Sequence, residues 1–369
     1  MFYYLAEFLK PYFGPARLLQ SHALLLAGGT FFAALLTWIL LPRLWGKLPT
    51  DRGKAICADL GGMKSAGKPT GTGLLVTLIA LPVIVLFVPL AFWDAMCVAG
   101  FYAAMLFGYL DDQAKIPWGE GKKLVLDIVV SFAIAGFIFC GHAEHINGLI
   151  GPRMIAWLPF WKEIVYIPFW IYVPFAGMVI LFTLNATNCS DGVDGLAGTL
   201  TVTTLVILAV ILYVVVGYRP VAHYFLIPVY SEAARWAILT MTVAGAFGGY
   251  LWFNAEPSKI LMGDAGSRFL GVLVATASLM TGNPLLIVAL SPVVLVNGGG
   301  GLVKLLLLRF AKKAGFQIDD DNVLKRIRFP LHDHCKKKLG WSNAQVLMRF
   351  MLLQLIIMPI LLILLIKVR

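Results

Sequence analysis

The stretch ALLLAGGTFFAALLTWILL, residues 23–41, is apolar over almost its whole length and contains no charged side chain. A helix needs roughly 20 such residues to cross the hydrocarbon core of a bilayer. Comparable stretches recur along nearly the whole chain, and no segment between them is long enough to form an independent soluble domain. We therefore expect one polytopic membrane domain over residues 1–369.

Composition supports this interpretation, because 60% of the residues are hydrophobic and only 13% are charged. Soluble domains carry about a quarter charged residues. The net charge of +11 could suit nucleic acid, but the basic residues lie mostly between the apolar stretches, as the positive-inside rule requires. We expect a lipid bilayer as partner and no nucleic acid. The five cysteines show no CxxC spacing, which indicates neither a zinc module nor a disulfide framework.

The apolar stretches predict an all-α integral membrane protein with about ten transmembrane helices. The first is retained, because no small-residue cleavage site follows residue 41. The expected spans are 21–42, 70–92, 95–110, 123–141, 164–184, 196–217, 236–253, 267–281, 284–309 and 344–367.

Alternation of the spans sorts the connections into two sets. One set comprises about 43–69, 111–123, 185–195, 254–266 and 309–343, and the other comprises both termini, 142–163 and 217–235. The first set holds most of the 30 Lys and Arg residues, which places it in the cytoplasm. Both termini are then extracytoplasmic.

Acidic residues gather at the predicted cytoplasmic ends of the spans. They are Asp111, Asp112, Asp191, Asp194 and Asp264. Adjacent carboxylates repel each other unless a cation or strong hydrogen-bond donors offset the charge, although an isolated Asp-Asp pair can also be solvated. Together, the five predict a cation site that faces an amphipathic substrate at the water–lipid boundary.

Two of these acidic segments are rich in polar groups and glycine. NATNCSDGVDGL, Asn185–Leu196, holds more donors and acceptors than one helix cap needs, and its glycines allow a ligand to approach the backbone. In LMGDAGS, Leu261–Ser267, Asp264 stands between two glycines where a helix begins. The helix start favours phosphate and the carboxylate favours a metal. This pattern predicts a magnesium–diphosphate site, with a simple N-cap as the alternative.

Basic residues near these acids are further candidates. His332 and His334, in FPLHDHCKKKLGW (329–341), could receive a phosphate or polarise a leaving group. Lys122 or Lys123 could pair structurally with an acid or hold a phosphate. Lys123 is favoured because it shares a helix face with the membrane-embedded Asp127, and Lys68 is a similar candidate.

Three other polar positions receive no catalytic role. We expect His142 and His145, on the other side of the membrane, to be solvated. The glycine run after Asn297 lacks the context of a phosphate-binding loop, and it predicts helix packing or a kink.

Taken together, GYLDD, NATNCSDGVDGL, MGDAGS and PLHDHCKKKLGW, in this order, resemble the polyprenyl-phosphate N-acetylhexosamine-1-phosphate transferase superfamily over almost the whole chain. The resemblance implies a magnesium-dependent enzyme of the bacterial inner (plasma) membrane. This enzyme would transfer phospho-N-acetylmuramoyl-pentapeptide from UDP-MurNAc-pentapeptide to undecaprenyl phosphate, giving UMP and the lipid I of peptidoglycan biosynthesis. A homodimer is compatible with this resemblance.

The resemblance also assigns roles. It implies an acidic catalytic centre of Asp111, Asp112 and Asp264, all three near the metal, with Asp264 the strongest ligand. One acid of the pair would be a base or nucleophile, and both direct attack by the lipid phosphate and a covalent intermediate stay open. With the basic residues added, the catalytic candidates are Asp111, Asp112, Asp264, His332 and Lys123, and the substrate-binding candidates are Lys68, Asn188, Asp191, Asp194, Asn254 and His334.

The chain departs from the usual superfamily pattern in several places. It has PTGTG after the first loop, Ser190 before the central Asp-Gly, and His332-Asp333-His334 in place of three histidines. His332 is then the first choice and His334 the second. Two other functions remain open: a sister transferase that moves GlcNAc-1-phosphate, and an ion-coupled transporter, whose acids should instead lie at mid-span or in internal repeats.

Overall fold

The computed structural model describes residues 1–51, 66–114, 116, 118–314 and 326–367. Parts of the predicted loops 43–69, 111–123 and 309–343, together with Cys57, lie outside these residues. The main helices are α2 (His22–Leu44), α3 (Thr72–Phe87), α4 (Phe92–Gln113), α5 (Glu120–His142), α6 (Phe169–Cys189), α7 (Leu196–Val210), α9 (Ala233–Asn254), α10 (Gly263–Leu279), α13 (Gly300–Lys313) and α16 (Asn343–Lys367). The shorter elements are α1 (Phe2–Leu9), η1 (Gly14–Gln20), η2 (Trp45–Lys47), β1 (Glu144–His145), β2 (Pro152–Ala156), β3 (Val165–Pro168), η5 (Ile211–Val216), α8 (Arg219–Tyr224), α11 (Leu286–Leu290), α12 (Pro292–Val294), η6 (Leu295–Gly299) and α15 (Leu331–Leu339).

Each apolar stretch predicted to span a membrane contains helix in the described chain, although the stretch 164–184 begins with β3. Among the described residues, eight helical segments are long and apolar enough to cross a bilayer: His22–Lys47, Phe92–Gln113, Glu120–His142, Phe169–Cys189, Leu196–Val216, Ala233–Asn254, Pro292–Lys313 and Asn343–Lys367. The other two, α3 and α10, have 16 and 17 residues. The protein is therefore a mostly helical, multi-pass membrane protein.

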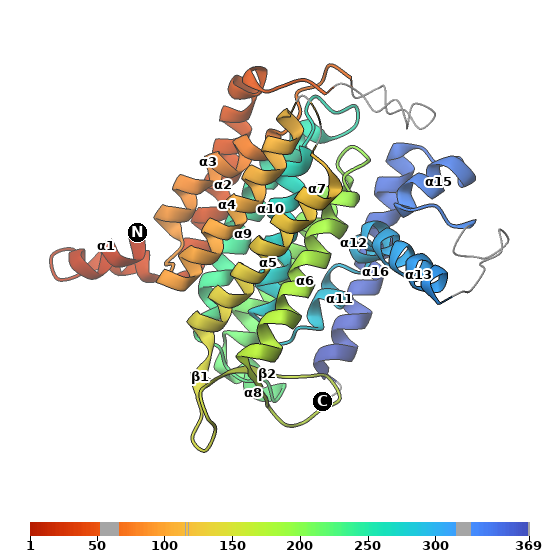
Figure 1. Cartoon of the computed structure of the whole chain (residues 1–369). Helices are drawn as coiled ribbons and strands as arrows, with labels where there is room; N and C mark the ends of the chain where they lie inside the picture. Colours follow the sequence, from red (N-terminus) through yellow and green to blue (C-terminus); the bar gives the residue numbers. More distant parts are fainter. Residues whose placement is uncertain (52–65, 115, 117, 315–325, 368–369) are drawn as a thin grey trace.

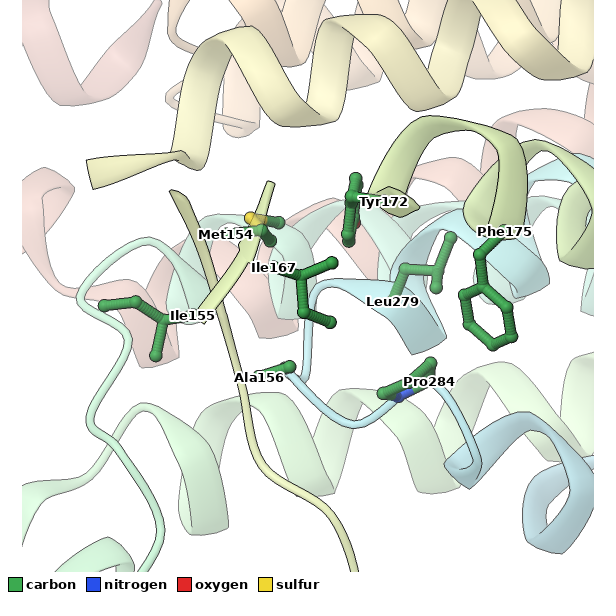
Figure 2. A pocket seen from close by; sticks show the side chains of 9 residues that line it. Met154, Ile155, Ala156, Ile167, Tyr172, Phe175, Leu279 and Pro284 are labelled. Carbon is green, nitrogen blue, oxygen red and sulfur yellow. The ribbon is translucent and has the colours of Figure 1, made fainter. Parts of the chain in front are cut away.

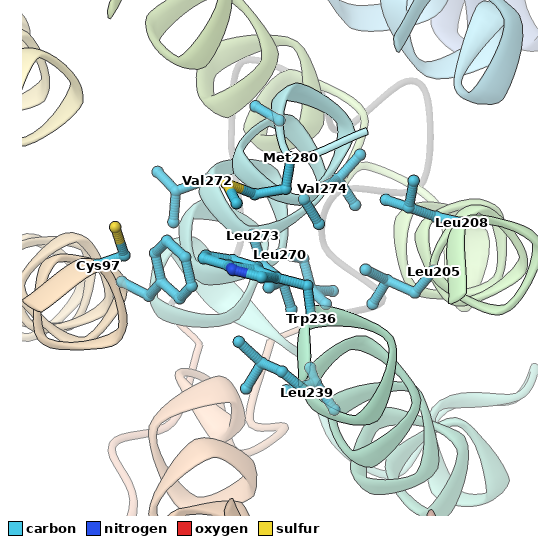
Figure 3. Packing of buried hydrophobic residues seen from close by; sticks show 14 of the residues in the cluster. Cys97, Leu205, Leu208, Trp236, Leu239, Leu270, Val272, Leu273, Val274 and Met280 are labelled. Atoms are coloured by element: carbon cyan, nitrogen blue, oxygen red, sulfur yellow. The ribbon is translucent and has the colours of Figure 1, made fainter. Parts of the chain in front are cut away.

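Helix α10 lies at the centre of the bundle. Every residue from Ala265 to Leu279 is buried, and the helix packs against α3, α4, α6, α7 and α9. Figure 3 shows Trp236 of α9 among the apolar side chains of α10, with Cys97 of α4 and Leu205 of α7 on either side. Because α10 begins at Gly263, this packing fixes Asp264 in the middle of one end of the bundle, which we call the aspartate end.

The opposite end of the bundle carries a small antiparallel sheet in the order β1-β2-β3 (Figure 1). We call this the sheet end. Arg153 pairs with Pro168 and Ala156 with Val165. An apolar pocket lies between this sheet, α6 and the turn after α10, and Figure 2 shows Tyr172 and Phe175 beside it. The pocket is far from the aspartates, and the sheet is a local departure from the predicted all-α fold.

One prediction at the sheet end was wrong. His142 is not solvated, because its Nε2 atom lies 3.1 Å from Oδ1 of Asp94, and its side chain is only 13% exposed. Asp94 also accepts a hydrogen bond from the Trp236 indole and pairs with Arg235. A carboxylate in this apolar interior requires such partners. His145 is exposed, as expected.

The predicted span 284–309 is broken into α11, α12, the π-helical η6 and α13. Ser291 has a non-helical backbone (φ −129°, ψ 42°), and Pro292 starts the next short helix. A Cβ atom on Gly298 would lie 1.9 Å from the carbonyl oxygen of Ala186, so only glycine allows η6 to touch α6 here. The glycine run thus provides the predicted close packing, whereas the break in the span lies before it, at Ser291 and Pro292. Helix α13 projects from the bundle (Figure 1).

Three helices near the aspartate end, α4, α6 and α10, start earlier or end later there than predicted. Helix α6 continues to Cys189, so that Asn185 and Asn188 are helical rather than in a loop. Asn185 donates to the Leu181 carbonyl four residues earlier, which engages its amide with its own helix. Likewise, Asp111 and Asp112 lie in the last turn of α4 and Asp264 lies in the first turn of α10.

Candidate active site

The end of α4 and the start of α10 meet through glycine. Gly108 faces the Asp264 backbone so closely that an added Cβ atom would lie 2.5 Å from the Asp264 carbonyl oxygen. Gly263 adopts φ +71°, a conformation that favours glycine, and faces Asp112. As a result, the Asp264 N–H donates to Oδ2 of Asp112 at 2.8 Å. Two predicted acids are thus neighbours at the centre of the aspartate end.

Helix α3 closes the same junction from the other side. A Cβ atom on Gly73 would lie 2.2 Å from the Cα atom of Gly266. The Thr72 and Gly73 amides donate to the carbonyls of Leu261 and Met262 at 3.1 and 3.0 Å. The PTGTG and MGDAGS segments are therefore joined by backbone hydrogen bonds. Glycine at both contact points was the available signal for this packing.

Asp111 is held differently from Asp112. Its Oδ1 atom accepts the Trp118 N–H at 2.9 Å, and its Oδ2 atom lies 2.6 Å from Nζ of Lys123 near the start of α5. An acid is unfavourable at the C-terminal end of a helix such as α4, where the helix dipole is negative. Lys123 offsets that cost and ties α5 to α4. The structure therefore brings Lys123 to Asp111, whereas Asp127, the residue that favoured Lys123 in the sequence, pairs with Arg268.

Three loops meet beside this centre through Asp194. Its Oδ2 atom accepts the Ser258 N–H at 3.2 Å and lies 3.6 Å from Nζ of Lys68, which also donates to the Ser258 hydroxyl at 2.8 Å. Lys68 and Asp194 are thus together, and sequence reasoning missed Ser258.

Asn254 connects the same loops, because its side chain accepts from Gly195 N–H and donates to the Ile260 carbonyl. Both ends of its amide are therefore engaged within the protein.

His332 approaches the 190–195 loop from α15. An added Cβ atom on Gly192 would lie 2.3 Å from its Nε2 atom. Asn297 of η6 fixes the histidine, since its Oδ1 atom accepts the His332 N–H at 2.9 Å and lies 3.1 Å from Nδ1. The kinked ninth span therefore positions His332, a role that the sequence did not assign to Asn297. His334 instead accepts the Arg328 N–H at its Nδ1 atom.

Charge connects four of the aspartates at this end of the bundle. Asp112 interacts through charge with Asp264, Asp111 and Asp191, so the acids predicted from separate loops share one field. Among the described residues, no three His, Cys, Asp or Glu side chains stand close enough together to hold a metal ion by themselves. Asp112 and Asp264 form the adjacent pair, while Asp111 is occupied by Lys123.

Asn188 adds an unused donor to the site. Its Nδ2 atom is buried without a hydrogen-bond partner among the described residues, and such a group is costly unless a ligand or water satisfies it. A binding role for Asn188 stays a prediction, and this orphaned amide supports it.

Comparison with known proteins gives one consistent result. Residues 94–282, which include the five aspartates, match glycosyl transferase family 4. A phospho-N-acetylmuramoyl-pentapeptide-transferase of Treponema pallidum (strain Nichols) is 41% identical over 352 residues, covering 94% of this chain and 91% of the relative. Proteins of the same name from Borreliella burgdorferi (strain ZS7) and Methylacidiphilum infernorum (isolate V4) are 29% and 26% identical, over 92% and 96% of the chain and 95% and 97% of each relative. These matches show that the chain belongs to glycosyl transferase family 4, in the group of phospho-N-acetylmuramoyl-pentapeptide-transferases.

Proposed function

We propose that the protein transfers phospho-N-acetylmuramoyl-pentapeptide from UDP-MurNAc-pentapeptide to undecaprenyl phosphate, forming lipid I and UMP in peptidoglycan synthesis. The observation that carries this proposal is the junction of α4 and α10, where Asp112 binds the backbone of Asp264 at one end of a membrane bundle. Asp264 is 29% exposed there, which suits a soluble donor. The exposed apolar side chains of α13 and α16 suit a lipid acceptor.

Magnesium fits the Asp112–Asp264 pair. Mg²⁺ usually binds one or two carboxylates, keeps several waters and shares the phosphates of a substrate. Two neighbouring carboxylates provide that set, and the need to offset their repulsion supports a cation between them. When bound, magnesium would neutralise the diphosphate and polarise the phosphoryl group that is attacked. Asp111 is the weaker candidate ligand, because both of its oxygens already have partners.

The remaining residues orient the two substrates in this proposal. Lys123, held by Asp111 at the centre, provides positive charge for a phosphate. The orphaned amide of Asn188 donates to the nucleotide, with Asp191 and the Lys68–Asp194 pair beside it. His332, fixed by Asn297, acts on the phosphate side of the donor. Roles for Asn254 and His334 stay predictions, as do the choice of base and homodimer formation.

The assay that tests this function measures radiolabelled transfer by the purified chain from UDP-MurNAc-pentapeptide and, separately, from UDP-GlcNAc. We expect a lipid-linked product and UMP only from the muramoyl donor, and only with magnesium. A product from UDP-GlcNAc alone would refute the proposal in favour of the sister reaction. Transport of a substrate into sealed vesicles without UMP release would favour an ion-coupled transporter instead.

We also propose ten spans, with both termini outside and the aspartate end in the cytoplasm of the bacterial inner membrane. The distribution of Lys and Arg supports this orientation. Sealed inverted vesicles should then use added nucleotide without permeabilisation, because their cytoplasmic face points outward. Equal activity of sealed right-side-out vesicles would contradict this orientation.

The contacts of Asp111 predict a specific kinetic effect of Asp111→Asn. The amide cannot hold Lys123 by charge, so we expect turnover to fall about a hundredfold, in the range for misplacing one catalytic group. The magnesium concentration for half-maximal activity should change less than about threefold, because Asp112 and Asp264 are unaltered. Magnesium titrations of both proteins check this, and a large loss of magnesium affinity would instead make Asp111 a ligand.

A further inference from the structure

A buried arginine stands directly behind the proposed metal ligand. Arg268 lies one turn after Asp264 on α10 and is only 5% exposed. Its Nη1 atom donates to Oδ1 of Asp127 on α5, and its Nε atom lies 3.7 Å from Oδ2 of Asp264. A charged guanidinium within a membrane bundle must be paired. Arg268 therefore stands between two carboxylates, one structural and one in the active site.

The two carboxylates hold the arginine unequally. Asp127 is 3% exposed, hydrogen-bonds Arg268 and is also hydrogen-bonded by Asn185 of α6. By contrast, the buried Nε–H of Arg268 has no hydrogen-bond partner among the described residues. It faces Asp264 from just beyond hydrogen-bonding distance. The guanidinium is thus held to α5 through its Nη1 atom, and its Nε–H remains an unsatisfied donor on the side of Asp264.

This geometry creates a competition for Asp264. A guanidinium can bind a carboxylate through two parallel hydrogen bonds, and a carboxylate bound in that way is less available to a cation. We propose that Asp127 is a positioning residue that restrains Arg268, so that Arg268 does not capture Asp264 and Asp264 stays open to a divalent cation. The inference rests on the proposed metal role of Asp264 and adds a determinant of metal affinity outside the site.

The proposal predicts that Asp127→Asn weakens cation binding, because Arg268 loses its charged anchor and turns toward Asp264. We expect the Mn²⁺ dissociation constant, measured by electron paramagnetic resonance on the purified full-length protein, to rise about tenfold. Mn²⁺ is the probe because it accepts the same oxygen ligands as Mg²⁺. The magnesium concentration for half-maximal transfer should rise in parallel.

Two further variants separate this effect from simple damage to the fold. In Asp127→Leu/Arg268→Leu both charges are absent, and replacing a buried ion pair by apolar residues is often tolerated. We expect its Mn²⁺ affinity to lie within about threefold of the wild type, since the competitor is gone. Arg268→Leu alone should bind Mn²⁺ at least as tightly as the wild type. Weaker binding by either variant would overturn the proposal, even if Asp127→Asn failed to fold.

The matched control is Asp94→Asn. Asp94 is another buried carboxylate paired with an arginine, Arg235, but it lies at the other end of α4, roughly 25 Å from Asp111 along the helix. This variant should lower the melting temperature and leave the Mn²⁺ dissociation constant unchanged. Unchanged Mn²⁺ binding by folded Asp127→Asn would refute the inference alone. A wild-type protein that bound no Mn²⁺ and needed no Mg²⁺ would refute the proposed metal site itself.

Discussion

Asp264→Asn is expected to reduce transfer at least about a thousandfold, because the amide removes the charge that faces both magnesium and the diphosphate. The fold should survive, since Asp112 accepts its hydrogen bond from the Asp264 backbone rather than from the side chain. The substitution therefore isolates the carboxylate charge from the packing of α4 on α10.

The measurement for Asp264→Asn is single-turnover UMP release at saturating magnesium, together with thermal unfolding. Turnover should collapse while the melting temperature stays within about 3 °C of the wild type. Glu163→Gln, the same change of charge at an exposed position of the sheet end, is the control and should keep full activity. Near-normal turnover of Asp264→Asn would remove this residue from the catalytic centre.

Gly108→Ala should also reduce transfer strongly, although it adds only a methyl group. The new Cβ atom would meet the Asp264 carbonyl oxygen at 2.5 Å and the Ala265 nitrogen at 2.8 Å. Because these are backbone atoms, α4 and α10 must separate, and Asp112 then loses the Asp264 N–H. A displacement of about 1 Å at a catalytic group can cost a hundredfold in rate. We expect a loss of that size.

Stability should also fall in Gly108→Ala, by about 1–3 kcal/mol, the usual cost of overpacking. Unfolding in denaturant and the transfer assay on the same preparation measure both effects. Gly136→Ala is the matched control, because an added Cβ on this helical glycine of α5 meets nothing within 4 Å. It should be neutral or slightly stabilising, as alanine favours a helix. If Gly108→Ala behaved like this control, the close contact would not position the site.

The sequence was sufficient to predict the membrane class and the helical segments, because apolar length is a local property. It also predicted that acids from separate segments would gather at one end. The Asp127–Arg268 pair escaped prediction, although Asp127 was recognised as membrane-embedded. The two residues are 141 positions apart, and sequence alone does not pair them.

Three local causes explain the other differences between the predicted and the observed structure. Asn185 and Asn188 look like loop residues, but Asn185 bonds back to its own helix and α6 continues through both. The strands β1 and β3 have 2 and 4 residues, too few for an alternating pattern to stand out. His142 appeared solvated because its partner, Asp94, lies on another helix.

The glycine contacts of Gly73 with Gly266 and of Gly108 with Asp264 have a consequence for motion during turnover. These backbones touch without intervening side chains. We therefore expect α3, α4 and α10 to keep fixed positions relative to one another next to the reacting groups. Rearrangement that admits the donor and releases UMP should therefore occur at the opposite wall. There the Gly192 backbone faces the His332 side chain, and Val193 packs in the same apolar cluster as Cys335, so this contact can change by rotation of side chains.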